Sequence, residues 1–278
     1  MAASGVNISW PQVTVAKWSD LEVLTELSMR SGAFKDLYAF RGQSVADYSL
    51  RPTLLRHVVR GGLSAEAALS LERFAVAEFQ AQAHLHIDAS LLPPINETLR
   101  WWGLMQHHRA ATRLLDWSAS PYVAAYFAVE DQWDSDGAIW YFDIRRLSDR
   151  MRTLYGGPSS IDAHEFDALY CQPHVAPRIV LRKPTHRSNR MVAQQGGFSF
   201  CGQILRDHAE TIHEALSVVT ATEASIPVYG RMVIPAHLKP EILDRLRVMN
   251  ITAAALFPGV DGLGRSIDEF VRAGTQPK

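Results

Sequence analysis

The residues best suited to chemistry lie close together, between Leu104 and Val129. This stretch contains paired histidines, an arginine, an aspartate and two serines, namely His107, His108, Arg113, Asp116, Ser118 and Ser120. Ser120 followed by Pro121 is typical of a helix N-cap with proline at the first helical position. The free backbone N–H groups at such a helix start favour an anion or a phosphate. We therefore expect an anion site here, although Asp116 could instead only cap the turn and pair with Arg113.

Two helices would hold these residues in place. Residues 121–129 (PYVAAYFAV) are apolar on all sides, which predicts a buried helix. A preceding helix over 97–107 would deliver the histidines. Because donors are crowded here, we expect Asp116 to be paired, with Arg113, His107 or the backbone at the start of the buried helix.

A second candidate is Arg41, in the aromatic-rich run Leu37–Gln43 (LYAFRGQ). This run predicts a strand that leads into a turn. Phe40 and Gly42 flank the arginine, so the backbone is open on one side and packed on the other. That environment favours a bound anion at Arg41, while a plain surface charge is the alternative.

The sequence gives little support for a metal site. His84, His86 and Asp88 resemble the first half of the H-x-H-x-D motif of two-metal hydrolases. Ala89 stands where the next histidine would be expected, and no strand clearly precedes the motif. We therefore expect solvated histidines at a helix end and no metal.

Composition excludes several classes of protein. The 278 residues carry a net charge of −1 and are 47% hydrophobic, which argues against a protein that coats nucleic acid. Basic residues gather between 145 and 190, above all in 178–190, where a solvated surface is favoured over an anionic partner. Two cysteines give no disulfide framework, and no apolar run reaches the length of a membrane span. We expect a soluble, cytoplasmic protein, and the sequence does not predict its oligomeric state.

The order of elements predicts an α+β fold. Strands are expected at about 12–16, 37–41, 138–144, 178–181, 228–234 and 251–257, and helices at about 64–82, 97–107, 121–129, 208–219, 240–249 and 266–273. Strands and helices alternate without a regular βαβα order, and no glycine-rich phosphate loop is present. We expect a mixed or mostly antiparallel sheet around the buried helix, with residues 1–17 as a tail and 18–278 as a single domain. Residues 190–200 are expected to contain a turn or bulge.

Several motifs resemble the FRG family, named for its Phe/Tyr-Arg-Gly motif. Phe40-Arg41-Gly42-Gln43 and residues 49–56 (SLRPTLLR) match it, and residues 106–128 (QHHRAATRLLDWSASPYVAAYFA) resemble the family signature QHxGxPTRLLDWTxSPxxAxxFA. The resemblance covers about 35–140 closely and about 190–270 more loosely. The chain departs from it in Arg109-Ala110-Ala111, where the family tends to have Gly-x-Pro, and in Ser118, which replaces the usual threonine. Arg109 in place of glycine is expected to alter the turn beside the histidines.

The resemblance leaves two functional hypotheses open for a family found in bacteria and phages. The first is an effector in a defence or toxin setting that resembles NAD-dependent ADP-ribosyltransferases and their split sheet, with NAD as cofactor. Arg41 would bind the dinucleotide phosphates and Gln195 would orient the ribose or the target, although an amide cannot act as a general base. The expected ligand contacts are Arg41, Gln43, His107, Arg113, Asp116, Ser118, Ser120 and Tyr126. The second hypothesis is a non-catalytic module that binds a nucleotide, a phage component or a protein target.

Overall fold

The structure is a computed structural model that describes residues 10–29, 37–156, 166, 170–183, 188–219 and 227–274. Its strands are β1 (Gln12–Thr14), β2 (Tyr38–Gln43), β3 (Leu115–Ser118), β4 (Gly137–Asp143), β5 (Ile179–Arg182), β6 (Gly196–Cys201) and β7 (Tyr229–Ile234). Its longer helices are α1 (Glu22–Met29), α2 (Thr53–Arg60), α3 (Ala65–Ala83), α4 (Thr98–His107), α5 (Pro121–Val129), α6 (Ile144–Tyr155), α9 (His208–Leu216), α10 (Lys239–Val248) and α12 (Val260–Gly274). The short helical segments are η1 (Trp18–Leu21), η2 (Ala89–Leu91), α8 (Asn189–Ala193), η3 (Ala236–Leu238) and α11 (Ala253–Leu256).

The strands of the described residues form one mixed sheet of seven, in the order β1-β7-β4-β2-β3-β6-β5. β1 runs parallel to β7, and the other neighbours are antiparallel. The expected α+β class with a mostly antiparallel sheet is therefore confirmed. Within the described part of the chain, no helix is both long and apolar enough to cross a membrane.

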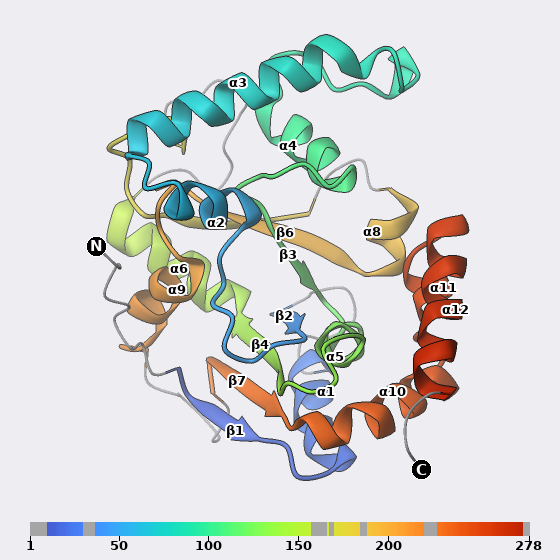
Figure 1. Cartoon of the computed structure of the whole chain (residues 1–278). Coiled ribbons are helices and arrows are strands. Elements are labelled where there is room, and N and C mark those ends of the chain that lie inside the picture. Colours follow the sequence, from blue (N-terminus) through green and yellow to red (C-terminus); the bar gives the residue numbers. More distant parts are fainter. Residues whose placement is uncertain are drawn as a thin grey trace.

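Alternating side chains divide the core between the two faces of the sheet. Along β4, Ile139 and Tyr141 join a cluster with α1, α5, α10 and α11, while Trp140 and Phe142 join a cluster with α6 and α9. This is the two-residue period of a strand that is buried on both faces. Helices α2, α3 and α4 lie beyond β3 and β6, at the top of Figure 1.

The predicted buried helix is confirmed as α5. Ser120 caps it, with its Oγ accepting a hydrogen bond from the Val123 N–H at 3.3 Å, and Pro121 occupies the first turn. α5 packs on β2 so closely that a Cβ on Gly42 would lie 1.8 Å from the carbonyl oxygen of Ala124. In the family-like Arg41-Gly42 pair, the candidate ligand-binding residue Arg41 is thus followed directly by the glycine that allows α5 to lie close to β2.

The structure corrects one predicted strand and adds two. Residues 251–257 are not a strand, because Thr252 caps the helix α11 through the Ala255 N–H, and a run of alanines favours helix. Strands β3 and β6 were not predicted, and the turn or bulge expected at 190–200 is α8 followed by β6. The other expected strands and helices are present with shifted ends; the last helix begins at Val260 rather than at 266. Of the basic stretch 178–190, residues 184–187 lie outside the described residues.

Helix α12 is fixed to the end of α5 by polar contacts. The Tyr126 hydroxyl donates a hydrogen bond to Glu269, Arg265 lies 3.8 Å from Glu130, and Arg272 lies 3.2 Å from Asp131. Burial raises the pKa of Glu130 to about 7, although the charge of Arg265 acts in the opposite direction.

Replacing Gly42 with alanine is expected to destabilise the fold by about 2 kcal/mol or more, because backbone atoms of α5 would have to move. Urea unfolding measures the change. Gly103→Ala in α4 is the control, since its nearest heavy atom would be Phe198 Cε1 at 3.8 Å, and we expect it to be neutral or slightly stabilising. Equal stability of the two variants would contradict the close approach of α5.

The Glu130 carboxyl predicts a pH dependence of stability. The pKa of Glu130 rises from 4.5 to about 7 on folding, so the folded state favours the protonated carboxyl. The contribution of this group to the stability of the fold is therefore complete below the unfolded pKa and is lost as pH rises through the folded pKa. Between pH 4.5 and 7.5 the wild type should lose about 1–3 kcal/mol of unfolding free energy relative to Glu130→Gln. Urea unfolding of both proteins across this range measures the difference, and a constant difference would refute the raised pKa.

Candidate functional site

The sheet opens between β2 and β3. Within the described residues one register pair, Phe40 with Ser118, joins these strands, whereas β2 pairs with β4 over its whole length. Past that pair Arg41 spans the opening, and its Nη1 donates a hydrogen bond to the Asp116 carbonyl oxygen at 2.7 Å. A side chain thus makes the contact that backbone pairing would make in a continuous sheet.

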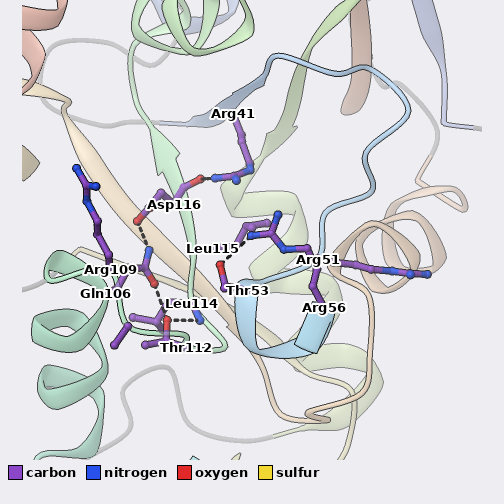
Figure 2. Close-up of a pocket in the computed structure, with 11 residues that line it drawn as sticks. Arg41, Arg51, Thr53, Arg56, Gln106, Arg109, Thr112, Leu114, Leu115 and Asp116 are labelled. Carbon is purple, nitrogen blue, oxygen red and sulfur yellow. Dashed lines mark hydrogen bonds between the residues drawn. The ribbon is translucent and has the colours of Figure 1, made fainter. Parts of the chain in front are cut away.

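A pocket of about 220 Å³ lies at this opening, and we call it the arginine pocket (Figure 2). Among the described residues it is lined by Arg41, Arg51, Thr53, Arg56, Gln106, Arg109, Ala110, Thr112, Leu114, Leu115 and Asp116. Four of these are arginines and one is a carboxylate, so the lining carries an excess of positive charge. Such a pocket suits an anion with several oxygen acceptors, since guanidinium groups match phosphate and carboxylate geometry.

Two arginines are held by neighbouring side chains. Arg51 Nε lies 2.9 Å from Asp207, which also accepts a hydrogen bond from the Ser49 hydroxyl and caps α9 through the Ala209 N–H. Arg56 Nη2 donates to Thr53 Oγ1 at 2.8 Å within α2. Both contacts leave N–H groups of the guanidinium available to a ligand.

Arg109 occupies an unusual backbone position after α4. Its φ is 65°, in the left-handed region that favours glycine, and the family pattern tends to have glycine there. In the described part of the chain, no hydrogen bond or ion pair engages its exposed side chain. The departure from the family pattern therefore adds a free cation to the pocket, as well as altering the turn.

Asp116 is paired, as expected, but the partner of its carboxylate is Gln106 rather than Arg113, His107 or the backbone at the start of α5. Its Oδ1 accepts a hydrogen bond from Gln106 Nε2 at 2.6 Å, and the Gln106 amide oxygen accepts one from Thr112 Oγ1 at 2.7 Å (Figure 2). These two hydrogen bonds orient the Asp116 carboxylate at the rim of the pocket, where the Asp116 side chain is exposed.

The electrostatics around Arg41 favour an anion. Burial lowers the pKa of Arg41; the negative charge of Asp116 raises it, and the positive charge of Arg56 lowers it further. The guanidinium nevertheless stays charged at neutral pH. Its Nε is buried without a hydrogen-bond partner among the described residues. An anion between Arg41 and Arg56 would offset both the desolvation and the repulsion.

A second pocket of about 160 Å³ adjoins the arginine pocket and shares Arg41 and Asp116 with it. Its remaining described lining is partly apolar and consists of Phe40, Gly42, Trp117, Ser118, Val123, Ala124, Phe127, Arg190 and Gln194. Ser118 Oγ donates to the Gln194 carbonyl at 2.8 Å, which ties β3 to the segment before β6. The pair of pockets offers a charged compartment next to a more apolar one.

Arg113 lies elsewhere, in a buried ion pair with Glu72 of α3. Arg113 Nε lies 2.7 Å from Glu72 Oε1, and its Nη1 donates to the Tyr170 carbonyl at 2.8 Å. Burial by itself would lower the pKa of Arg113, but the charge and hydrogen bonds of Glu72 outweigh it and raise that pKa. The pairing of Arg113 with Asp116 is therefore wrong, and Arg113 lines neither pocket.

The other predicted site residues are spread around the pockets without lining either of them. Tyr126 binds Glu269 inside the core, Ser120 caps α5, and Gln43 Nε2 donates to the Ser49 carbonyl at 3.3 Å. His107 is exposed beside His108; partial burial and the charges of His108 and Arg190 lower the pKa of His107. Of the expected contacts, the structure brings Arg41, Asp116 and Ser118 together.

Gln195, which is expected together with Arg41 to be catalytic, is exposed and has a φ of 48°. Its carbonyl accepts the Ala119 N–H at 3.1 Å, and its neighbour Gln194 lines the second pocket instead. Sequence reasoning also missed Arg51, Arg56, Arg109 and Arg190. The first two stand in the family-like motif SLRPTLLR, and Arg109 stands at the departure from the family glycine, so both signals were present. Among the described residues, no group of three or more metal-ligating side chains could hold a metal.

Replacing Arg113 with alanine is expected to destabilise the protein by about 3–5 kcal/mol, because Glu72 would remain buried without its partner. Glu72→Leu combined with Arg113→Met should recover most of this loss, since it removes both charges and keeps the volume. Urea unfolding gives the free energies. A loss below 1 kcal/mol for Arg113→Ala would show that Arg113 is not a structural residue.

Comparison with known families agrees with the motifs. Residues 36–137 match the model of the FRG domain. That range runs from before β2 to the start of β4 and contains Arg41, Arg51, Arg56, Arg109 and Asp116. No curated protein and no solved structure matches the chain, so the resemblance to ADP-ribosyltransferases finds no matching fold. The chain carries an FRG domain over residues 36–137.

Proposed function

We propose that this FRG domain binds a nucleotide and holds its phosphates with the arginines of the arginine pocket. The observation that carries the proposal is the convergence of Arg41, Arg51, Arg56 and Arg109 on one pocket of the described structure, from β2, the segment before α2, α2 and the end of α4. A purely structural role does not require four arginines around one pocket, because like charges repel each other where they are partly desolvated.

The affinity that such a pocket can supply is sufficient for a nucleotide. A charge-assisted hydrogen bond contributes about 1.5–3 kcal/mol, and a micromolar complex requires roughly 8 kcal/mol. Contacts to Arg41, Arg56 and Arg109 would reach this range before the loss of ligand freedom is counted. A nucleoside diphosphate or a dinucleotide such as NAD fits this requirement.

The second pocket would receive the part of the nucleotide beyond its phosphates. Phe40, Val123 and Phe127 supply apolar surface, and Ser118 and Gln194 supply polar groups. Together the two volumes fall in the lower part of the roughly 300–1,000 Å³ typical of ligand pockets. Asp116 lies between the two pockets, where its carboxylate can accept a hydrogen bond from a ribose hydroxyl.

A binding role is favoured over ADP-ribosyl transfer. Gln195 is exposed outside both pockets, and its amide cannot serve as a general base. Asp116 is the carboxylate that lines the pockets within the described residues, and its Oδ1 is already engaged by Gln106. Transfer of ADP-ribose is therefore the alternative that the experiment with NAD distinguishes from binding alone. A role in defence or toxicity remains a prediction from the family resemblance.

ADP and NAD should raise the melting temperature at millimolar concentration, whereas adenosine, which lacks phosphates, should not. A ligand that binds only the folded state stabilises it by mass action. Arg41→Ala and Arg56→Ala should each weaken binding about 10- to 100-fold in calorimetric titration, the equivalent of one charge-assisted bond. Arg60→Ala is the matched control, because Arg60 is exposed on α2 and lies outside both pockets.

Two results would contradict the proposal. If no nucleotide shifts the melting curve, the proposal is wrong, and the domain is instead an interaction module without a nucleotide ligand. A shift that survives the Arg41→Ala, Arg56→Ala double variant would place the phosphates elsewhere, with the basic stretch 178–190 next to be tested. Release of nicotinamide from NAD together with attachment of ADP-ribose to an acceptor in a cell extract, both lost in Gln195→Ala, would instead establish transfer chemistry and assign Gln195 to it.

A further inference from the structure

Helix α12 presents its apolar side to solvent. Its large apolar side chains are mostly exposed: Val260 (84%), Leu263 (59%), Ile267 (57%), Phe270 (75%) and Val271 (55%). The residues that it buries are Gly262 and Glu269. Figure 1 shows α12 along the outer edge of the molecule. A surface helix ordinarily has the opposite orientation, with its apolar side on the core.

The inner face of α12 fixes this orientation. Glu269 accepts a hydrogen bond from Tyr126, and Arg265 and Arg272 lie near Glu130 and Asp131. A Cβ on Gly262 would lie 1.9 Å from the Phe257 carbonyl oxygen, so only glycine permits the close contact there. Rotating the helix to bury its apolar side would break these contacts and leave Tyr126 and Glu130 against an apolar surface without their polar partners.

The exposed side chains follow the spacing of a helix–helix seam. Val260, Leu263, Ile267 and Phe270 are separated by three, four and three residues, which is the spacing of a and d positions in a heptad. The fifteen residues of α12 extend over roughly 22 Å, about two heptads. We propose that this seam packs against the same seam of α12 in a second copy of the chain, forming a homodimer.

The residues beside the seam favour an identical partner. The flanking e and g positions hold Gly264, Ser266, Val271 and Ala273, none of which is charged. Two copies can therefore approach closely without like charges facing each other, which is the usual obstacle to self-pairing of a helix. The charged residues of α12 lie at the other heptad positions.

Other occupants fit less well. An amphipathic helix that lies on a membrane is rich in Lys and Arg on its polar face, whereas α12 has three acidic residues and two arginines, which already pair within the molecule. The sequence segments outside the described residues lack a run of large apolar residues at the seam spacing. A second copy supplies a matching seam without any further requirement.

The size of the seam sets the expected strength. Two such helices would bury on the order of 1,000 Å² in total, at the low end of specific interfaces. We therefore expect a reversible dimer that forms in the micromolar range. This inference is independent of nucleotide binding, because α12 contributes no residue to either pocket of the described structure.

Sedimentation velocity of the full chain tests the proposal. The wild type should shift from monomer to dimer as its concentration rises from about 1 to 200 μM, a range set by the expected micromolar affinity. Ile267→Glu should weaken dimerisation at least 100-fold and leave the melting temperature of the monomer unchanged, because the side chain is exposed. Phe74→Glu on α3 is the matched control, since Phe74 is 62% exposed and lies outside the seam.

Cross-linking gives a second readout. Under mild oxidation, Ile267→Cys should form a covalent dimer, while the native Cys171 and Cys201 are buried. A wild type that stays monomeric throughout, or a dimer that persists in Ile267→Glu, would overturn the proposal. So would binding of the monomer to phosphatidylserine vesicles that is lost in Ile267→Glu, because the seam would then serve a membrane.

Discussion

The hydrogen bond from Arg41 to the Asp116 carbonyl is the contact on which the site depends. It replaces backbone pairing where β2 and β3 separate after Phe40 and Ser118, and it spans the boundary between the two pockets. A continuous sheet at this point would use the peptide groups for pairing and leave no room for a ligand. A guanidinium has five N–H donors, so the hydrogen bond from Arg41 can hold the two strands in position while other N–H groups remain available to an anion. Structure and binding are therefore combined in one side chain.

The walls of the opening are held by contacts that come from distant parts of the chain. α5 lies against β2 because Gly42 permits it, and this places the capped start of the helix beside Ser118. On the other side, Trp117 Nε1 donates to Ser199 Oγ, which lies 3.0 Å from His208 Nδ1. Burial lowers the pKa of His208 to about 4, so this buried network is neutral at physiological pH. Asp207, the residue before His208, positions Arg51. The rigidity around the pocket thus comes from β6 and α9, although the arginines belong to the FRG domain.

Local chemistry in the sequence was sufficient to predict the centre of the fold but not its long-range pairing. Ser120-Pro121 and the run behind it, which is apolar on all sides, predicted α5 correctly, because capping and uniform hydrophobicity act within one element. Arg113 was misassigned because its partner, Glu72, is 41 residues away on α3, and no spacing rule links them. Residues 251–257 contain both β-branched and alanine residues, so their pattern suits either a strand or a helix. The cap from Thr252 to the Ala255 N–H stabilises the helical start. Strand β6 was missed because its glycines indicated a turn. Arg51 and Arg56 were visible in the motif, but their convergence with Arg109 depends on how α2 and α4 pack around β3.

The most direct test of the central claim is a crystal structure of the protein with ADP. We predict that the diphosphate lies in the arginine pocket, with its oxygens within hydrogen-bond distance of Arg41 and Arg56 and near Arg109, and with the Arg41–Asp116 contact retained. A diphosphate bound outside this pocket, or one that binds only after β2 and β3 close into continuous pairing, would contradict the account.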